Sequence, residues 1–382
     1  MIETLRRFAE HLSLSLPDRM REFITRQGLF MLNSSGLRQV PAFLLSGPTQ
    51  RTGQLGRLLL VGHEPWVDYL PRRLFSGDPR RETLGRIGIK ALPEFLGRFH
   101  ESVDLTVARV DRRSGRRMLA DTYLAVPEWV GTKLMVPDNL EAHVRSGGSI
   151  RRDMTLVRRH GYQPLLSDGR DDFEMFYQSF YTPFTHERYG EMAFMRTAHD
   201  LRRRVRRGGI LWVQRAGSRV AAVLFELHER TIDLLALGTL KGDRELVKEG
   251  AIAALYYFII ELARTRDCRI VDFRGSRPSL RDGLLRYKSK WGATLYDKTD
   301  SYHDLFIRWG RVNGVVKEFL SHTPLIFRDE GRLSAVSADE SNCGEALWVN
   351  GLHRLYLLTE SGRQPIRGAE HGNGTLAGCV GS

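Results

Sequence analysis

The chain has 382 residues, 42% of them hydrophobic, which is enough for two domains that each bury a core. Its formal net charge is +13, but 50 of the 58 basic residues are arginine, and the base composition of a gene explains that bias more simply than selection for phosphate contacts. The longest apolar run, residues 251–260, is too short to span a membrane, and residues 1–16 lack a secretory apolar core, so we expect a cytoplasmic protein.

The first part of the chain predicts a mixed α/β domain, to which we assign residues 1–150. Residues 1–26 have the pattern of an amphipathic helix, and short apolar runs follow at 42–45 and 58–61. Two further apolar segments, 105–110 and 118–126, flank a stretch of turn-forming residues. This pattern predicts a long hairpin.

Helices dominate the next stretch of sequence. Residues 139–159 are helical in pattern, with an interruption at Gly147-Gly148. Residues 171–181 form a strongly amphipathic helix that we expect Pro183 to close. The segment 181–189 (YTPFTHERY) is then predicted as a loop, and a helix over 198–207 leads into the next domain.

Residues 210–297 predict three consecutive hairpin strands, then helix, strand, helix and strand. The strands are rich in β-branched and aromatic residues between turn formers, and the first helix is apolar almost all round, as expected for a helix buried against a sheet. The predicted strands are 210–215, 220–227, 231–237, 269–273 and 293–297, and the predicted helices are 250–262 and 279–291. We assign residues 151–325 to this domain.

The remainder predicts a strand at 302–307, a helix at 312–319 and a C-terminal extension over 326–382. The extension contains a predicted hairpin across Asn350-Gly351 and ends in a tail with the composition of a disordered segment. The cysteines, Cys268, Cys343 and Cys379, form neither a CxxC pair nor a Cys/His cluster, so we predict no metal site.

Specific residues within the second domain carry a family resemblance. The chain has VDFRGS at 271–276 and YKSKWG at 287–292, preceded by Gly217, Val220-Ala221-Ala222 and a glycine, Gly250, that opens the buried helix. Residues 170–300 resemble the GNAT superfamily of N-acyltransferases. The closer likeness is to the branch of Fem-type peptidoglycan aminoacyltransferases and polysaccharide-cluster acetyltransferases. The resemblance implies a mixed α/β fold, a GNAT-like sheet flanked by helices, with two such domains in tandem.

The resemblance also implies an activity: transfer of an acetyl or aminoacyl group from a thioester or tRNA carrier to an amine. The implied acceptor is an amino sugar or a cell-envelope precursor. The donor, acetyl-CoA or aminoacyl-tRNA, would lie between the strands 231–237 and 269–273, near Leu235, Leu237, Lys241, Gly242 and Gly250. The segment 240–249 departs from the glycine-rich pyrophosphate loop of acetyl-CoA enzymes, which leaves both donors open.

Lys288 and Asp272 are the predicted catalytic residues. Lys288 shares a helix face with Leu284 and Trp291, and in the family this lysine lies at the transfer site. Asp272 sits within an apolar strand, so it needs a partner, and either Arg274 or Lys288 would serve. It is thus either a structural ion-pair residue or the general base that takes the amine proton.

Five further residues are predicted to bind substrate. Arg274 follows the strand and is placed to meet an anionic ligand, and the loop residues His186 and Arg188 mix with aromatic residues. Tyr287 and Trp291 are packing residues that also shape the pocket wall. Glu226 and His228 receive no role.

A catalytically inactive GNAT scaffold that binds nucleic acid is the alternative. The arginine cluster at 202–207 is either its contact surface or the solvated end of a helix.

Overall fold

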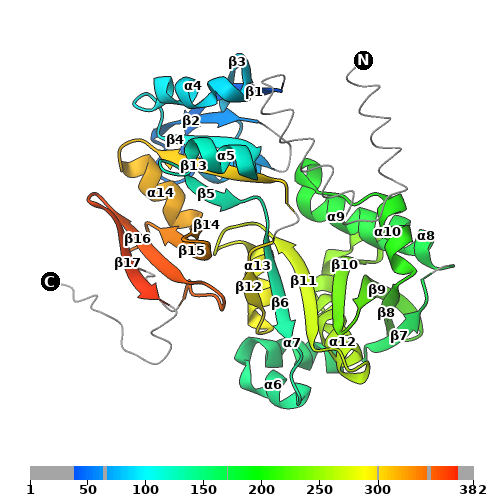
Figure 1. Cartoon of the computed structure of the whole chain (residues 1–382). Helices are drawn as coiled ribbons and strands as arrows, with labels where there is room; N and C mark the ends of the chain where they lie inside the picture. The colour runs from blue at the N-terminus through cyan, green and yellow to red at the C-terminus, as the bar shows by residue number, and fades with distance from the viewer. Residues whose placement is uncertain (1–37, 63–66, 170, 299–300, 342–345, 369–382) are drawn as a thin grey trace.

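The computed structural model describes residues 38–62, 67–169, 171–298, 301–341 and 346–368. The helix predicted over 1–26 and the tail after residue 368 therefore lie outside the described residues. Three sheets form the framework, and Figure 1 shows the N-terminal sheet (blue, with the gold strand β13) above the C-terminal sheet. No helix in the described ranges is long and apolar enough to cross a membrane.

The N-terminal sheet has six strands in the order β3-β1-β2-β4-β13-β5. Four helices flank it: α3 (Tyr69–Leu74), α4 (Leu92–Phe99), α5 (Arg112–Leu119) and α14 (Gly314–His322). Its strands are β1 (Gln39–Pro48), β2 (Leu55–Val61), β3 (Arg80–Gly88), β4 (Leu105–Asp111), β5 (Leu124–Pro127) and β13 (His303–Trp309).

The C-terminal sheet has seven strands in the order β12-β6-β11-β10-β9-β8-β7, and its edge strand β7 is Gln163–Ser167. It contains the predicted sequence of elements: β8 (Gly208–Arg215), β9 (Ser218–His228), β10 (Thr231–Thr239), α12 (Ala251–Thr265), β11 (Ile270–Ser276), α13 (Gly283–Lys290) and β12 (Thr294–Tyr296). Helix α13 begins four residues later than predicted, because Asp282 rather than Ser279 caps it and accepts the N–H of Leu285. The predicted GNAT-like mixed sheet flanked by helices is confirmed.

The two large sheets exchange strands. β6 (Val130–Met135) lies between β11 and β12 of the C-terminal sheet, although it belongs to the N-terminal 150 residues. In return, β13 lies between β4 and β5 of the N-terminal sheet. The chain therefore crosses between the two large sheets twice, before β6 and before β13, and each of these sheets includes a strand from the other part of the sequence.

Two predicted hairpins are wrong. β4 and β5 do not pair, because Asp111 accepts the N–H of Ser114 and starts α5 where the turn was expected, and β13 fills the space between them. Asn350-Gly351 forms a turn but no hairpin. The third sheet consists of β14 (Leu325–Asp329), β15 (Arg332–Ser337), β16 (Arg354–Thr359) and β17 (Gly362–Gly368), with β15 and β16 parallel.

The predicted loop at 181–189 is also wrong. Helix α8 (Phe173–Met175) continues through the π-helical turn η3 (Phe176–Tyr181) into α9 (Thr182–Tyr189). Pro183 does not close the helix, because it lies in the first turn of α9, where proline's missing N–H costs no hydrogen bond. The remaining helices are α6 (Leu140–Ser146), α7 (Gly148–Arg159), α10 (Ala198–Val205) and the short α11 (Arg244–Lys248).

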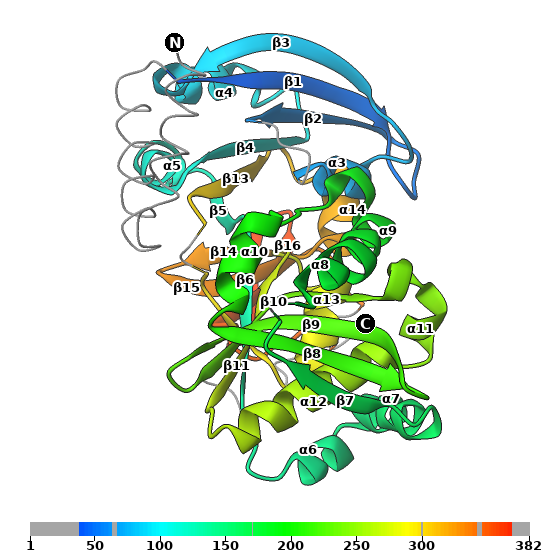
Figure 2. The same ribbon diagram turned by 90° about the vertical axis from the view of Figure 1, so that its right-hand side faces the viewer.

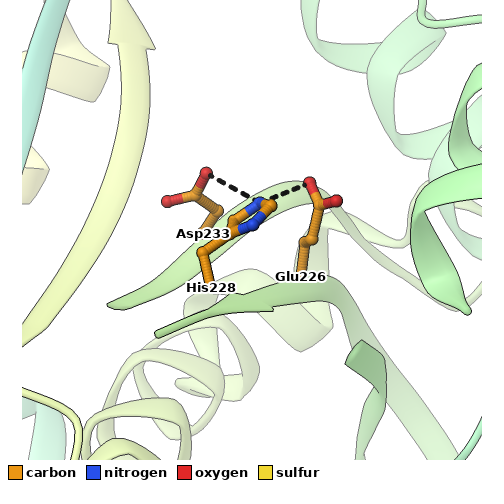
Figure 3. Close-up of side chains that lie close together, drawn as sticks. All are labelled: Glu226, His228 and Asp233. Carbon is orange, nitrogen blue, oxygen red and sulfur yellow. Dashed lines mark ion pairs between the residues drawn. The ribbon is translucent and has the colours of Figure 1, made fainter. Parts of the chain in front are cut away.

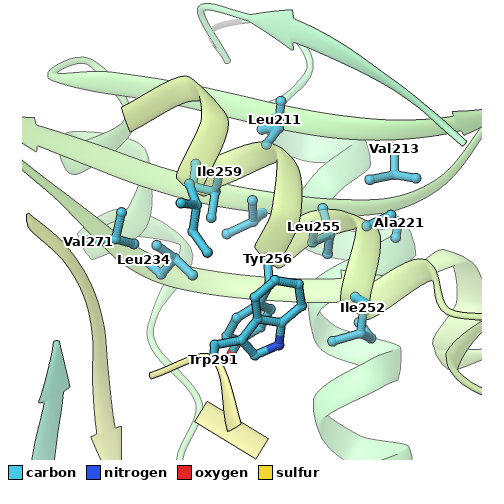
Figure 4. Close-up of a cluster of buried hydrophobic side chains, with 14 of the residues drawn as sticks. Leu211, Val213, Ala221, Leu234, Ile252, Leu255, Tyr256, Ile259, Val271 and Trp291 are labelled. Carbon is cyan, nitrogen blue, oxygen red and sulfur yellow. The ribbon is translucent and has the colours of Figure 1, made fainter. Parts of the chain in front are cut away.

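Hydrophobic clusters cover both faces of the C-terminal sheet. One face packs on α12, where Leu255, Tyr256 and Ile259 meet Leu234 and Val271 of the strands (Figure 4). The opposite face packs on η3 and α10 through a second cluster that includes Phe176, Phe180, Leu201, Trp212 and Leu224. Because the sheet is buried on both faces, its charged residues stand out as candidates for function.

Replacement of Gly131 by alanine is expected to destabilise the exchanged strand β6. An added Cβ would lie 2.1 Å from Cζ of Tyr296, so the phenol ring must move and release the carboxylate of Asp272, which its hydroxyl binds at 2.6 Å. We expect a loss of about 1–3 kcal/mol in the free energy of unfolding, measured by urea denaturation. Gly97→Ala, in open space on α4, is the control and should be neutral or stabilising. Equal effects of the two changes would contradict this.

Candidate functional site

The parallel strands β10 and β11 diverge. They pair only at Thr231–Asp233 with Ile270–Asp272, although β10 continues to Thr239 and β11 to Ser276. Beyond that point β11 pairs with β6 on its other side, through Arg274, Gly275 and Ser276. Beyond Asp233 and Asp272 the two strands therefore no longer pair, which is the V-shaped divergence expected between them.

Lys288 lies at the end of this gap with its ammonium group buried. The side chain is 3% exposed, and Nζ donates to the carbonyl oxygens of Arg274 at 3.2 Å and Gly275 at 2.8 Å and to Oγ of Ser276 at 3.1 Å. Burial lowers its pKa from 10.5 to about 7. An ammonium group has three N–H donors, and these three acceptors account for all of them.

Asp272 is fully engaged in local hydrogen bonds. One carboxylate oxygen accepts the main-chain N–H of Arg274 at 2.7 Å, and the other accepts the hydroxyl of Tyr296 at 2.6 Å. Lys288, one of its two predicted partners, instead binds the end of β11. Arg274, the other, lies 3.9 Å away at its nearest. These contacts favour the structural interpretation of Asp272.

Arg274 spans the opening. Its main chain has a φ of 63°, an uncommon left-handed conformation for a residue other than glycine, and β11 is irregular in register between Asp272 and Arg274. Its guanidinium lies 3.1 Å from the carboxylate of Asp233 on the opposite strand. Because the predicted anion-binding arginine pairs with a carboxylate of β10, it links the two diverging strands.

Asp233, which the sequence analysis did not select, lies where the divergence begins. It is aligned across the sheet with Glu226 on β9 and Asp272 on β11. Burial raises the pKa of Asp233, and the charge of Arg274 acts in the opposite direction. Strand alternation was the available signal, since three neighbouring predicted strands each carry one carboxylate within an apolar run.

His228 lies between the carboxylates of Glu226 and Asp233 (Figure 3). Its Nε2 is 3.0 Å from Glu226 and 4.0 Å from Asp233. Ligand-type atoms of all three residues lie within 4.8 Å of one another, a spacing that suits a metal ion. We assign no metal here, because arginines already balance the charge: Glu226 pairs with Arg204 and Arg207, and Asp233 pairs with Arg274.

Tyr287 and Trp291 pack against Tyr256 of α12. The ring centroids lie 5.1 Å and 5.8 Å from that of Tyr256, and Trp291 is fully buried. The face of α13 that carries these residues therefore contacts the core. Both residues position α13, and with it Lys288, against the sheet.

His186 and Arg188 lie on α9 rather than on a loop, and both are exposed. The guanidinium carbon of Arg188 lies 5.9 Å and 5.8 Å from the ring centroids of Phe184 and Tyr189. In the described part of the chain, no contact joins His186 to the opening. The helix leaves both side chains at the surface.

The predicted donor-binding residues lie at the far end of β10, but helices cover much of the backbone there. Leu235 is buried against the η3 side of the sheet, and Leu237 packs on the α12 side. Lys241 is exposed, whereas Gly242 lies under α9, where an added Cβ would be 2.9 Å from the carbonyl oxygen of Pro183.

Gly250, which precedes α12, is covered by α7. It has a φ of 94°, and a Cβ added to it would lie 3.1 Å from Cβ of Leu156. The first residues of the helix, Ala251, Ile252 and Ala253, are at most 7% exposed. Helix α7 therefore occupies the space where a pyrophosphate would approach the start of a GNAT helix.

The arginine cluster at 202–207 is largely engaged in ion pairs. Arg202 pairs with Glu174, Arg203 and Arg204 with Asp200, and Arg207 with Glu226. These pairs within the protein favour a structural role over nucleic-acid contact.

No family model matches the sequence, and no curated protein matches it. Several solved structures are similar in fold. FemX has 11% identity, with 72% of this chain and 90% of that chain covered and a TM-score of 0.38. A candidate lysylphosphatidylglycerol synthetase C-terminal domain from Agrobacterium fabrum has 12% identity, coverages of 70% and 81% and a TM-score of 0.35. L-PGS from Bacillus licheniformis has 12% identity, coverages of 70% and 84% and a TM-score of 0.33. At these values the likeness assigns neither activity nor substrate to this chain.

The buried ammonium of Lys288 should make stability depend on pH. Its pKa of about 7 in the folded protein lies below the unfolded value of about 10.4, so between these values the unfolded chain binds more protons. The free energy of unfolding then rises with pH, by up to about 1.4 kcal/mol per pH unit. We expect the difference between wild type and Lys288→Met, measured by urea denaturation, to grow in favour of wild type from pH 7 to pH 9. Parallel curves would refute the assignment.

Proposed function

We propose that this protein is an N-acyltransferase that moves an acyl group from a carrier directly to an amine. The observation that carries the proposal is the opening between β10 and β11, where main-chain groups of two parallel strands become available beside a buried carboxylate, Asp233. In the reaction, the amine nitrogen attacks the acyl carbonyl, a C–N bond forms, and the carbon–oxygen or carbon–sulfur bond to the carrier breaks. Main-chain N–H groups along the gap stabilise the tetrahedral oxyanion.

Asp233, rather than Asp272, is the proposed general base. Both carboxylate oxygens of Asp272 accept short hydrogen bonds that hold β11 and Tyr296. Asp233 is buried at the point where the strands separate, and burial raises its pKa, which favours proton uptake from an attacking amine. The proton released on C–N bond formation would move to this carboxylate.

Lys288 is proposed to position the site rather than to contact the substrate. Its three donors are taken by the carbonyls of Arg274 and Gly275 and by Ser276. These bonds hold the end of β11 against α13 and away from β10. The lysine thereby keeps open the gap in which the acyl carbonyl would lie.

The proposed donor is an aminoacyl-tRNA rather than acetyl-CoA. A CoA pyrophosphate needs free main-chain N–H groups at the start of α12, and α7 covers that region at Gly250. Two carboxylates near the same turn also disfavour a pyrophosphate there. Glu249 pairs with Arg215, and Asp153 pairs with Lys290, so neither cation is free to bind a phosphate. A carrier that presents only its acyl end to the gap requires no pyrophosphate site there.

The proposed acceptor is an amino sugar or a cell-envelope precursor, modified in the cytoplasm. Both classes of acceptor present a primary amine that can attack the acyl carbonyl directly. The nucleic-acid-binding alternative finds less support, because four arginines of the 202–207 cluster pair with carboxylates of the protein itself.

Asp233→Asn and Lys288→Ala should each abolish transfer while the protein remains folded. Loss of the base should lower kcat by about 10²–10⁴-fold, and loss of the lysine should let the end of β11 relax. Asp272→Asn is the matched control, since an amide oxygen still accepts one of its two hydrogen bonds, and it should retain most activity. Single-turnover rates measure transfer by each variant, and circular dichroism checks that each variant is folded. Full turnover by Asp233→Asn would remove it from the mechanism.

Mass spectrometry of the acceptor should identify the donor. We expect a mass increase with aminoacyl-tRNA and none with acetyl-CoA or longer acyl-CoAs, using a panel of amino sugars and envelope precursors. Thermal denaturation with and without CoA serves as an independent check, and no change in Tm is expected. Acetyl transfer from acetyl-CoA would overturn the choice of donor and leave the acyltransferase proposal standing.

A further inference from the structure

An arginine at the junction of the two halves has no carboxylate partner among the residues that the structure describes. Arg277 directly follows β11, and its guanidinium carbon lies 4.5 Å from the ring centroid of Tyr69, the first residue of α3. Within the described ranges, no carboxylate lies within 4.0 Å of Arg277. Burial lowers its pKa, so the guanidinium is partly withdrawn from water. A cation in this environment normally has an anionic partner.

The hydroxyl of Tyr69 also lacks a partner. The side chain is 6% exposed, and the oxygen has no hydrogen bond within the described part of the chain. Burial raises the pKa of Tyr69, and the charge of Arg277 counteracts this, so the hydroxyl lies within electrostatic range of that guanidinium. A buried hydroxyl without a hydrogen-bond partner destabilises the folded protein. Both groups are donors, so a ligand with acceptor oxygens would satisfy both.

The surroundings make an anion the suitable ligand. Arg73, in the last turn of α3, also lowers the pKa of Tyr69 by its charge. On α9, burial raises the pKa of Tyr189, while the charges of Arg188 and Arg277 lower it. Two acidic residues act on Tyr69 in the opposite direction: Asp282, which caps α13 and also acts on Tyr189, and Glu128, which pairs with Arg109. Figure 2 shows α3 and α9 on the side where the two halves meet.

The position of Arg277 indicates that the anion belongs to the acceptor substrate rather than to the donor. Ser276, the preceding residue, binds the ammonium of Lys288, so Arg277 lies next to the end of the gap. The donor side is defined by the segment after β10, residues 240–249, on the other strand. Arg277 instead follows β11 and contacts Tyr69 of the N-terminal half, the side from which the second substrate would approach.

We propose that Arg277 and the hydroxyl of Tyr69 form a subsite for an oxyanion, a phosphate or a carboxylate, on the acceptor substrate. The inference rests on the proposed function, because it assigns the anionic group to the molecule that supplies the amine. The planar guanidinium donates two parallel N–H bonds to such a group, and the phenol adds a third. The acceptor is thereby an amine that also carries a phosphate or carboxylate.

Isothermal titration calorimetry of the full chain with inorganic phosphate and with acetate tests the subsite without any donor. We expect Arg277→Gln and Tyr69→Phe each to weaken binding about tenfold or more. Tyr69→Phe removes only the hydroxyl and should leave Tm unchanged or higher, which separates binding from folding. Arg202→Gln, an exposed arginine of α10 paired with Glu174, is the matched control for the loss of one charge.

Stronger binding of phosphate identifies a phosphorylated acceptor, and stronger binding of acetate identifies a carboxylate. Equal affinity in wild type, Arg277→Gln and Tyr69→Phe, or no binding of either anion by wild type, overturns the subsite. These results do not depend on turnover. A subsite that fails therefore leaves the acyltransferase proposal standing, and failure to transfer from every donor leaves a confirmed anion site in place.

Discussion

A buried ammonium group fixes the geometry on which the site depends. Lys288 satisfies its three N–H bonds with oxygens from three successive residues of β11, Arg274 to Ser276. A buried charge without such acceptors would be costly, so the strand must present them to α13. The carbonyls that face Lys288 cannot also serve a continuous ladder with β10. At the same place, the register of β11 with β6 shifts between Asp272 and Arg274, and the main chain of Arg274 adopts a left-handed conformation.

The exchange of β6 and β13 gives the opening a rigid frame. On one side of the gap, β11 is held by β6 from the N-terminal part of the chain, and Tyr296 of β12 binds Asp272 across β6. Through these contacts the two halves are fixed with respect to each other. The contact between Tyr69 of one half and Arg277 of the other can therefore have a defined geometry.

The arginine excess has a largely structural explanation. Arg204 and Arg207 neutralise Glu226, and Arg274 joins Asp233 across the gap. On β14 of the third sheet, Arg328, itself buried, pairs with Asp304 of β13 and with Asp297. Guanidinium groups suit such sites because their planar donors bind carboxylates in pairs. Against this background, Arg277 differs in having an aromatic partner and, within the described part of the chain, no carboxylate partner.

The sequence by itself determined the elements of the C-terminal domain, because turn residues and the change from strand to helix periodicity are local properties. It also selected Lys288 and Asp272, as charges within apolar patterns. Only the tertiary structure decided that β6 enters the sheet, that Lys288 binds β11 rather than Asp272, and that Asp233 lies at the opening. It likewise placed Tyr69 beside Arg277, 208 positions later in the chain. Such contacts depend on strand order and register, which pairing between distant segments establishes and no local pattern records.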